Sequence, residues 1–136
     1  MTGVSARLLP GRRWCVVVAT VLASTAVIAP ARAASNVSCT YRLLAAWPGG
    51  FSADVSIANG GPTIDGWTVR WTFADATTVI QTWNSDLSEL DARVVTATNR
   101  AWNRFIPTGT VTSFGWTAQA VSTAVPTDLS VNGLRC

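Results

Sequence analysis

The sequence predicts an all-β fold, an antiparallel β-sandwich of the immunoglobulin-like or jelly-roll-like kind. Two features indicate it. Apolar and polar residues alternate within short runs, and turn-forming residues separate these runs about every ten positions. No part of the chain beyond residue 33 has the period of a helix, and no internal repeat or linker is visible. We therefore expect one small domain in that part of the chain.

The beginning of the chain has the pattern of an export signal. Basic residues precede an apolar run over residues 14–28, and the small-residue sequence Ala31-Arg32-Ala33 follows it. The apolar run is short for a membrane span. We expect a signal peptide over residues 1–33 and a secreted, extracellular domain over residues 34–136, with no membrane association after cleavage. Arg12-Arg13 leaves two export routes open, the general secretory route and the twin-arginine route.

The first two predicted strands, at 51–57 and 67–73, show the clearest alternation, and Asn59-Gly60-Gly61-Pro62 forms a strong turn signal between them. Shorter strand-like runs follow at 77–83, 93–98, 111–118 and 129–134. In a strand, alternate residues point to the same face of the sheet. The residues that we expect on the core face of the first two strands are Phe51, Ala53, Val55, Ile57, Trp67, Val69, Trp71 and Phe73.

Two cysteines remain once the predicted signal peptide is removed. Cys15 lies inside the apolar run of that peptide, whereas Cys39 and Cys136 lie near the two ends of the predicted domain. A pair of cysteines in an exported protein predicts a disulfide. Closing a loop of nearly one hundred residues would stabilise the domain by roughly 3–5 kcal/mol.

Charge and composition exclude several classes of function. The predicted domain keeps six arginines, seven acids and no lysine, for a net charge of −1, so no basic patch favours nucleic acid. The chain has no histidine, which excludes a histidine-based triad, a histidine-ligated zinc site and a two-histidine copper site. We expect no cofactor, no metal and no catalytic centre. Asp86, Glu89 and Asp91 cluster in a predicted surface turn, and a small glycoside hydrolase using Glu89 is the catalytic alternative.

Six tryptophans fall in the predicted domain. Trp67 and Trp71 alternate with polar residues and belong to the core, and we place Trp116 there with Phe114. The three others, Trp47, Trp83 and Trp102, lie beside turns or among polar residues. For Trp83 the alternation leaves both faces of its strand possible. Several exposed tryptophans would form a large apolar surface of the kind that marks a binding site.

Flat aromatic rings suit sugars, because a pyranose has apolar faces and a polar rim. Each tryptophan can cover about 150–250 Å² of apolar surface, and several rings in a row suit a repeating, flat ligand. Amide side chains beside these tryptophans could bond the hydroxyl rim, or could serve only the turns in which they lie. The candidate amides are Gln81, Asn84, Asn99 and Asn103.

Several motifs then occur in a fixed order from Cys39 to Cys136. They are Trp47-Pro48-Gly49-Gly50-Phe51, the pair around Asn59-Gly60 and Gly66-Trp67, Gln81-Thr82-Trp83-Asn84, Thr98-Asn99-Arg100-Ala101-Trp102-Asn103, Ser113-Phe114-Gly115-Trp116 and Asn132-Gly133-Leu134-Arg135-Cys136. Together they resemble family 2 carbohydrate-binding modules.

The resemblance implies a β-sandwich closed by a Cys39–Cys136 bridge, with Trp67 in the core. It also implies that Trp47, Trp83 and Trp102 form a flat aromatic strip on one sheet. In this family, modules with all three rings tend to bind crystalline cellulose and often chitin, while a xylan-binding subgroup turns one ring upright. A glycine at position 50, where a bulky side chain would raise the Trp47 ring, favours the flat form.

The chain departs from the family pattern at a few positions. They are Ala45-Ala46, Asp54 and Thr117, where family members often carry polar residues or asparagine.

We accordingly expect a secreted, non-catalytic carbohydrate-binding module that binds insoluble polysaccharide, crystalline cellulose first and chitin second. We expect it to act as a monomer. Its predicted ligand-binding residues are Trp47, Trp83, Trp102, Gln81, Asn84 and Asn103. The alternatives are a xylan-preferring binder, a relic or accessory piece of a glycoside hydrolase, and an adhesin that uses the strip to bind protein.

Overall fold

The computed structural model describes residues 2, 3, 11 and 36–136, so the expected signal peptide lies outside the described residues apart from three positions. The described residues 36–136 belong to one compact unit. In this described part of the chain, no helix is long and apolar enough to cross a membrane.

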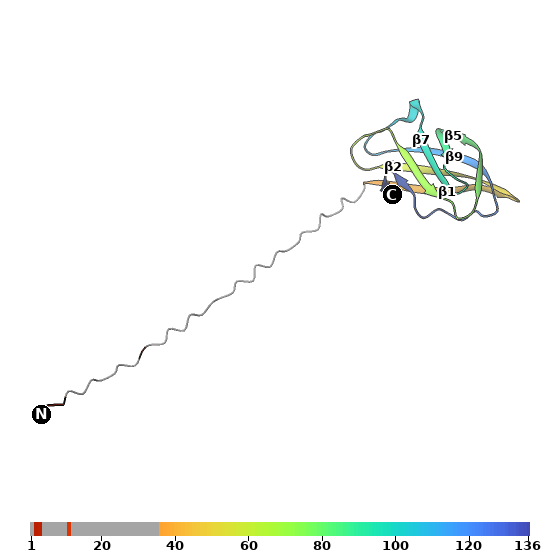
Figure 1. The fold of residues 1–136 in the computed structure, drawn as a ribbon. Coiled ribbons are helices and arrows are strands. Elements are labelled where there is room, and N and C mark those ends of the chain that lie inside the picture. The colour runs from red at the N-terminus through yellow and green to blue at the C-terminus, as the bar shows by residue number, and fades with distance from the viewer. Residues whose placement is uncertain (1, 4–10, 12–35) are drawn as a thin grey trace. The chain divides into compact units, whose positions relative to one another are not determined.

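The unit is an antiparallel β-sandwich (Figure 1). A four-stranded sheet has the order β1-β2-β9-β5, a five-stranded sheet has the order β11-β10-β4-β7-β6, and a short ribbon pairs β3 with β8. The strands are β1 (Val37–Trp47), β2 (Gly50–Asn59), β3 (Ile64–Asp65), β4 (Thr68–Thr72), β5 (Thr77–Trp83), β6 (Ser85–Glu89), β7 (Val94–Asn99), β8 (Phe105–Ile106), β9 (Thr110–Ala120), β10 (Ser130–Val131) and β11 (Leu134–Arg135). A single 3₁₀ turn, η1 (Ala101–Asn103), connects β7 to β8.

Aromatic rings join the two sheets in the core. Trp71 of one sheet stacks on Trp116 of the other with ring centroids 4.7 Å apart, and Trp67 stacks on Phe114 at 5.2 Å. All four side chains are fully buried. The period-two pattern predicted this core correctly, because every residue expected on the inner face of the first two runs is buried.

The two ends of the domain meet at the disulfide. Cys39 near the start of β1 is bonded to Cys136, the last residue, with a Cα–Cα distance of 5.3 Å. Figure 1 shows the C-terminus beside β1. The predicted bridge is therefore confirmed, and it joins two positions that are 97 apart in the sequence.

Three details of the predicted strand pattern need correction. The run at 129–134 is not one strand: Asn132 and Gly133 adopt positive φ and turn the chain between β10 and β11. The segment with Asp86 and Glu89 is strand β6, which pairs with β7, rather than a surface turn. The longest edge strand, β1, was not predicted, because its apolar residues near Leu44 do not alternate.

Candidate functional site

The outer face of the four-stranded sheet carries two of the three candidate tryptophans. A register shift in β5 between Val79 and Gln81 reverses the alternation along this strand. Thr82 then pairs with the inward-facing Trp116, so Gln81 and Trp83 face outward. The bulge explains why the sequence pattern could not decide the direction of Trp83.

Both rings lie down over glycines of neighbouring strands. A Cβ atom built on Gly50 would lie 2.6 Å from Nε1 and 2.9 Å from Cε2 of Trp47. A Cβ atom on Gly115 would overlap the Trp83 ring at Cζ2 and Cε2. Real Cβ atoms do not approach neighbours this closely, so each ring occupies the space that a side chain at the glycine would need. The result is a tryptophan held flat against the sheet.

Only small side chains lie on the sheet between the two rings. Trp47 pairs with Gly50, and Trp83 pairs with Gly115, which in turn faces Asp54 on β2. Gly50 and Asp54 are four positions apart along β2, which is about 13 Å in a strand. Between these positions β2 and β9 present only Ser52 and Thr117, two small polar side chains that pair across the strands.

Trp102 lies on η1 and is the most open of the three rings, with 73% of its surface exposed; Trp47 is 43% exposed and Trp83 is half-buried. A hydrogen bond attaches η1 to the end of β5: Nδ2 of Asn103 donates to the carbonyl of Asn84, directly after Trp83, at 2.6 Å. The Arg100 guanidinium lies over the Trp102 ring, 5.9 Å from its centroid, and pairs with Asp86 at 2.9 Å.

The four candidate amides have different surroundings. Asn99 accepts the backbone N–H of Trp67 and donates to the Arg100 carbonyl, so it serves the fold. Asn103 accepts the Arg100 N–H and donates to Asn84, so it positions η1. Gln81 and Asn84 are exposed beside Trp83, and Asn84 has a φ of 61°, a left-handed conformation in which asparagine is enriched.

An ion pair that the sequence did not indicate lies on the same face, in line with Trp83 across the paired strands. Arg42 of β1 donates from Nε and Nη2 to the two carboxylate oxygens of Asp54, at 3.0 and 2.7 Å. This bond and the carboxylate charge raise the pKa of the Arg42 guanidinium above its usual value. No local sequence signal predicts this pair, because its members are twelve positions apart and meet only through the register of β1 and β2.

A family model described as the cellulose binding domain matches residues 37–136, which is the whole sandwich. The chain belongs to this family.

Parts of two enzymes are similar in sequence to this cellulose-binding-domain member. Endoglucanase A of Thermobispora bispora is 46% identical over 78 residues, which are 57% of this chain and 17% of the relative. Exoglucanase A of Cellulomonas fimi is 36% identical over 118 residues, 84% of this chain and 13% of the relative. The chain thus spans less than a fifth of either glucanase.

A solved structure gives the same fold. The chitin-binding domain of a Streptomyces coelicolor protein superimposes with a TM-score of 0.64 at 27% identity, covering 76% of this chain and 96% of that domain.

Most acids of this cellulose-binding-domain member have a partner within the fold. Asp54, Asp65 and Asp86 pair with arginines. Glu89 accepts the backbone N–H of Val79 at 2.7 Å. The two others with backbone bonds are Asp91 and Asp128. Six of the seven acids in the sequence are therefore engaged, and Glu89, the catalytic alternative, is one of them.

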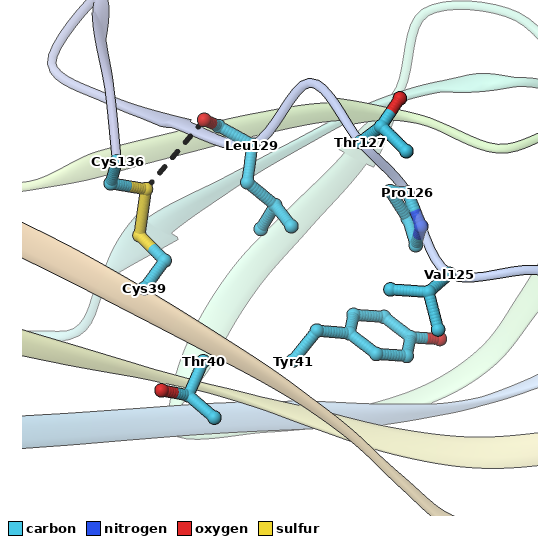
Figure 2. Close-up of a pocket in the computed structure, with 8 residues that line it drawn as sticks. All are labelled: Cys39, Thr40, Tyr41, Val125, Pro126, Thr127, Leu129 and Cys136. Atoms are coloured by element: carbon cyan, nitrogen blue, oxygen red, sulfur yellow. Dashed lines mark hydrogen bonds between the residues drawn. A yellow bond between two sulfur atoms is a disulfide. The ribbon is translucent and has the colours of Figure 1, made fainter.

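A concave hollow lies elsewhere on the domain, beside the disulfide, with a volume of about 350 Å³. Figure 2 shows the Tyr41 ring beside Val125, with Cys39 and Cys136 at the other side of the hollow. Burial raises the pKa of Tyr41 to about 12. The Tyr41 side chain belongs to the inner face of β1, so this hollow is separate from the aromatic face.

Proposed function

We propose that this domain binds insoluble β-1,4-linked polysaccharide, crystalline cellulose first, by stacking sugar rings on Trp47, Trp83 and Trp102. The observation that carries the proposal is the flattening of Trp47 and Trp83 over Gly50 and Gly115 on one sheet face, with only small side chains between them. Rings that lie flat on a sheet face suit the surface of a crystalline polymer. A single polysaccharide chain would instead suit a cleft. Gln81 and Asn84 supply rim hydrogen bonds, and Asn103 holds η1 in position.

The proposal includes the setting in which the domain works. Residues 1–33 act as a signal peptide and residues 34–136 as the secreted binding module, which is a non-catalytic monomer without a cofactor. The engagement of six of the seven acids supports the absence of catalysis, because a glycosidase needs two carboxylates that face the same sugar bond.

Depletion from solution by microcrystalline cellulose tests the proposal. The folded wild-type protein should be removed from solution, and the triple variant with alanine at the three tryptophans should remain in solution with nearly unchanged stability. Leu90→Ala is a control, since Leu90 is 70% exposed and directly follows β6, a strand of the other sheet. A folded wild-type protein that stays in solution contradicts the cellulose proposal.

Chitin is the second candidate, favoured by the fold shared with a chitin-binding domain. A panel of insoluble cellulose, chitin and xylan separates the ligands. The flat Trp47 ring argues against a xylan preference, because the xylan-binding subgroup of the family turns one ring upright. Release of reducing sugar that disappears in Glu89→Gln would instead support the hydrolase alternative, and capture of a protein but no glycan would support the adhesin.

A further inference from the structure

We propose that Arg42, held in place by Asp54, is a further sugar-binding residue of the aromatic face, and that it donates hydrogen bonds to the oxygens of a neutral polysaccharide. This inference rests on the proposed function. It adds a polar contact on strand β1, where Trp47 is the only residue assigned to sugar binding above.

The register of the sheet places Arg42 beside the tryptophans. Arg42 pairs with Asp54, Asp54 pairs with Gly115, and Gly115 pairs with Trp83. These four positions cross the sheet in one row from β1 to β5. Their neighbours along β2, Ala53 and Val55, are fully buried, so the row itself lies on the outer face.

The two members of the pair differ in exposure. The Asp54 side chain is only 11% exposed although it lies on an outer face, whereas the Arg42 side chain is 61% exposed. The carboxylate is therefore covered by its neighbours, whereas the guanidinium is accessible to a ligand. A bidentate bond fixes the plane of the guanidinium, so less side-chain freedom remains to be lost on binding.

The chemistry of the pair selects the ligand. A guanidinium has five N–H donors and no acceptor. Asp54 takes one from Nε and one from Nη2, so three donors remain. Because the carboxylate cancels the charge, the pair favours hydroxyl, ring or acetamide oxygens of a neutral polymer over carboxylates.

Binding isotherms on microcrystalline cellulose test the inference with Arg42→Ala, Asp54→Asn and the double variant. Arg42→Ala should weaken binding between about two- and tenfold, the range for one net hydrogen bond. Arg70→Ala is the matched control, because Arg70 is an exposed arginine on the outer face of the other sheet and should leave binding unchanged.

The double variant separates a direct contact from a structural one. Arg42→Ala leaves a covered carboxylate without its partner, whereas the Asp54→Asn background removes that charge. If Arg42 touches the sugar, its loss weakens binding in both backgrounds, because the amide oxygen of the Asp54→Asn variant still accepts an N–H of the guanidinium. If the loss disappears in the Asp54→Asn background, or if Arg42→Ala binds like the wild type, the inference is wrong while the proposed function stands. A wild-type protein that no polysaccharide removes from solution overturns both.

Discussion

Replacing Gly50 by alanine tests whether a flat Trp47 ring is what the ligand recognises. The new Cβ atom would lie 2.6 Å from Nε1 of Trp47 and 2.7 Å from the carbonyl oxygen of Ala118. The backbone oxygen is fixed by the sheet, while the ring is free to rotate. We therefore expect the ring to lift from the sheet, and the overpacking against Ala118 to cost about 1–3 kcal/mol of folding stability.

The loss of binding follows from the exposed area. Trp47 is 43% exposed, and a whole tryptophan offers up to about 250 Å², so about 100 Å² is open to a ligand. At about 25 cal/mol/Å² this area is worth roughly 2.5 kcal/mol before the costs of association. A ring standing on its edge gives up roughly half of this, which corresponds to roughly a tenfold loss of affinity.

Isotherms on microcrystalline cellulose measure this loss, and urea unfolding shows that the variant is folded under the assay conditions. A Trp47→Ala background provides the control. In that background Gly50→Ala should have no further effect on binding, because no ring remains to be lifted. Unchanged affinity of the single variant, or an equal tenfold loss in the control background, would refute the reasoning.

The other predictions concern stability. Trp67→Ala should lower the free energy of unfolding by about 3–5 kcal/mol in urea titrations, since it empties the space beside Phe114; a change below about 1 kcal/mol would contradict the core assignment. Serine at both Cys39 and Cys136 should cost about 3–5 kcal/mol by the same measurement, and an unchanged urea midpoint would contradict it. Two backbone N–H groups lower the pKa of Asp91, so its stabilisation is present above about pH 4 and fades as the pH falls further. Asp91→Asn should flatten that acid-side decline, and an identical pH profile would count against it.

The sequence could predict the core and the bridge because both follow simple rules. Apolar and polar residues alternate with period two wherever a strand is regular, as it is from Phe51 to Ile57. Two cysteines in an exported domain have one another as partners, and Cys39 and Cys136 are bonded. The expected exposure of Trp47 and Trp102 is also confirmed. Trp47 precedes a turn, and Trp102 lies among polar residues.

The parts that could not be predicted depend on irregular register. The bulge in β5 decides that Trp83 faces outward, and a second register shift near Leu44 hides strand β1 from an alternation test. Arg42 and Asp54 meet only once that strand is paired. Gly115 carried a usable signal: a glycine inside a strand often marks a close approach, here by the ring of Trp83.

Stability and binding are separable at one end of the aromatic face but coupled at the other. Trp47 lies over Gly50 outside the core, so changes there alter the binding surface and leave the stacked rings between the sheets untouched. Trp102 instead depends on η1, and the buried Trp67 helps to fix η1 by donating from Nε1 to the Asn103 carbonyl at 2.8 Å. A change at Trp67 therefore loosens the core and the turn that carries Trp102 together, whereas removal of the Trp47 ring alters the binding face and leaves the core in place.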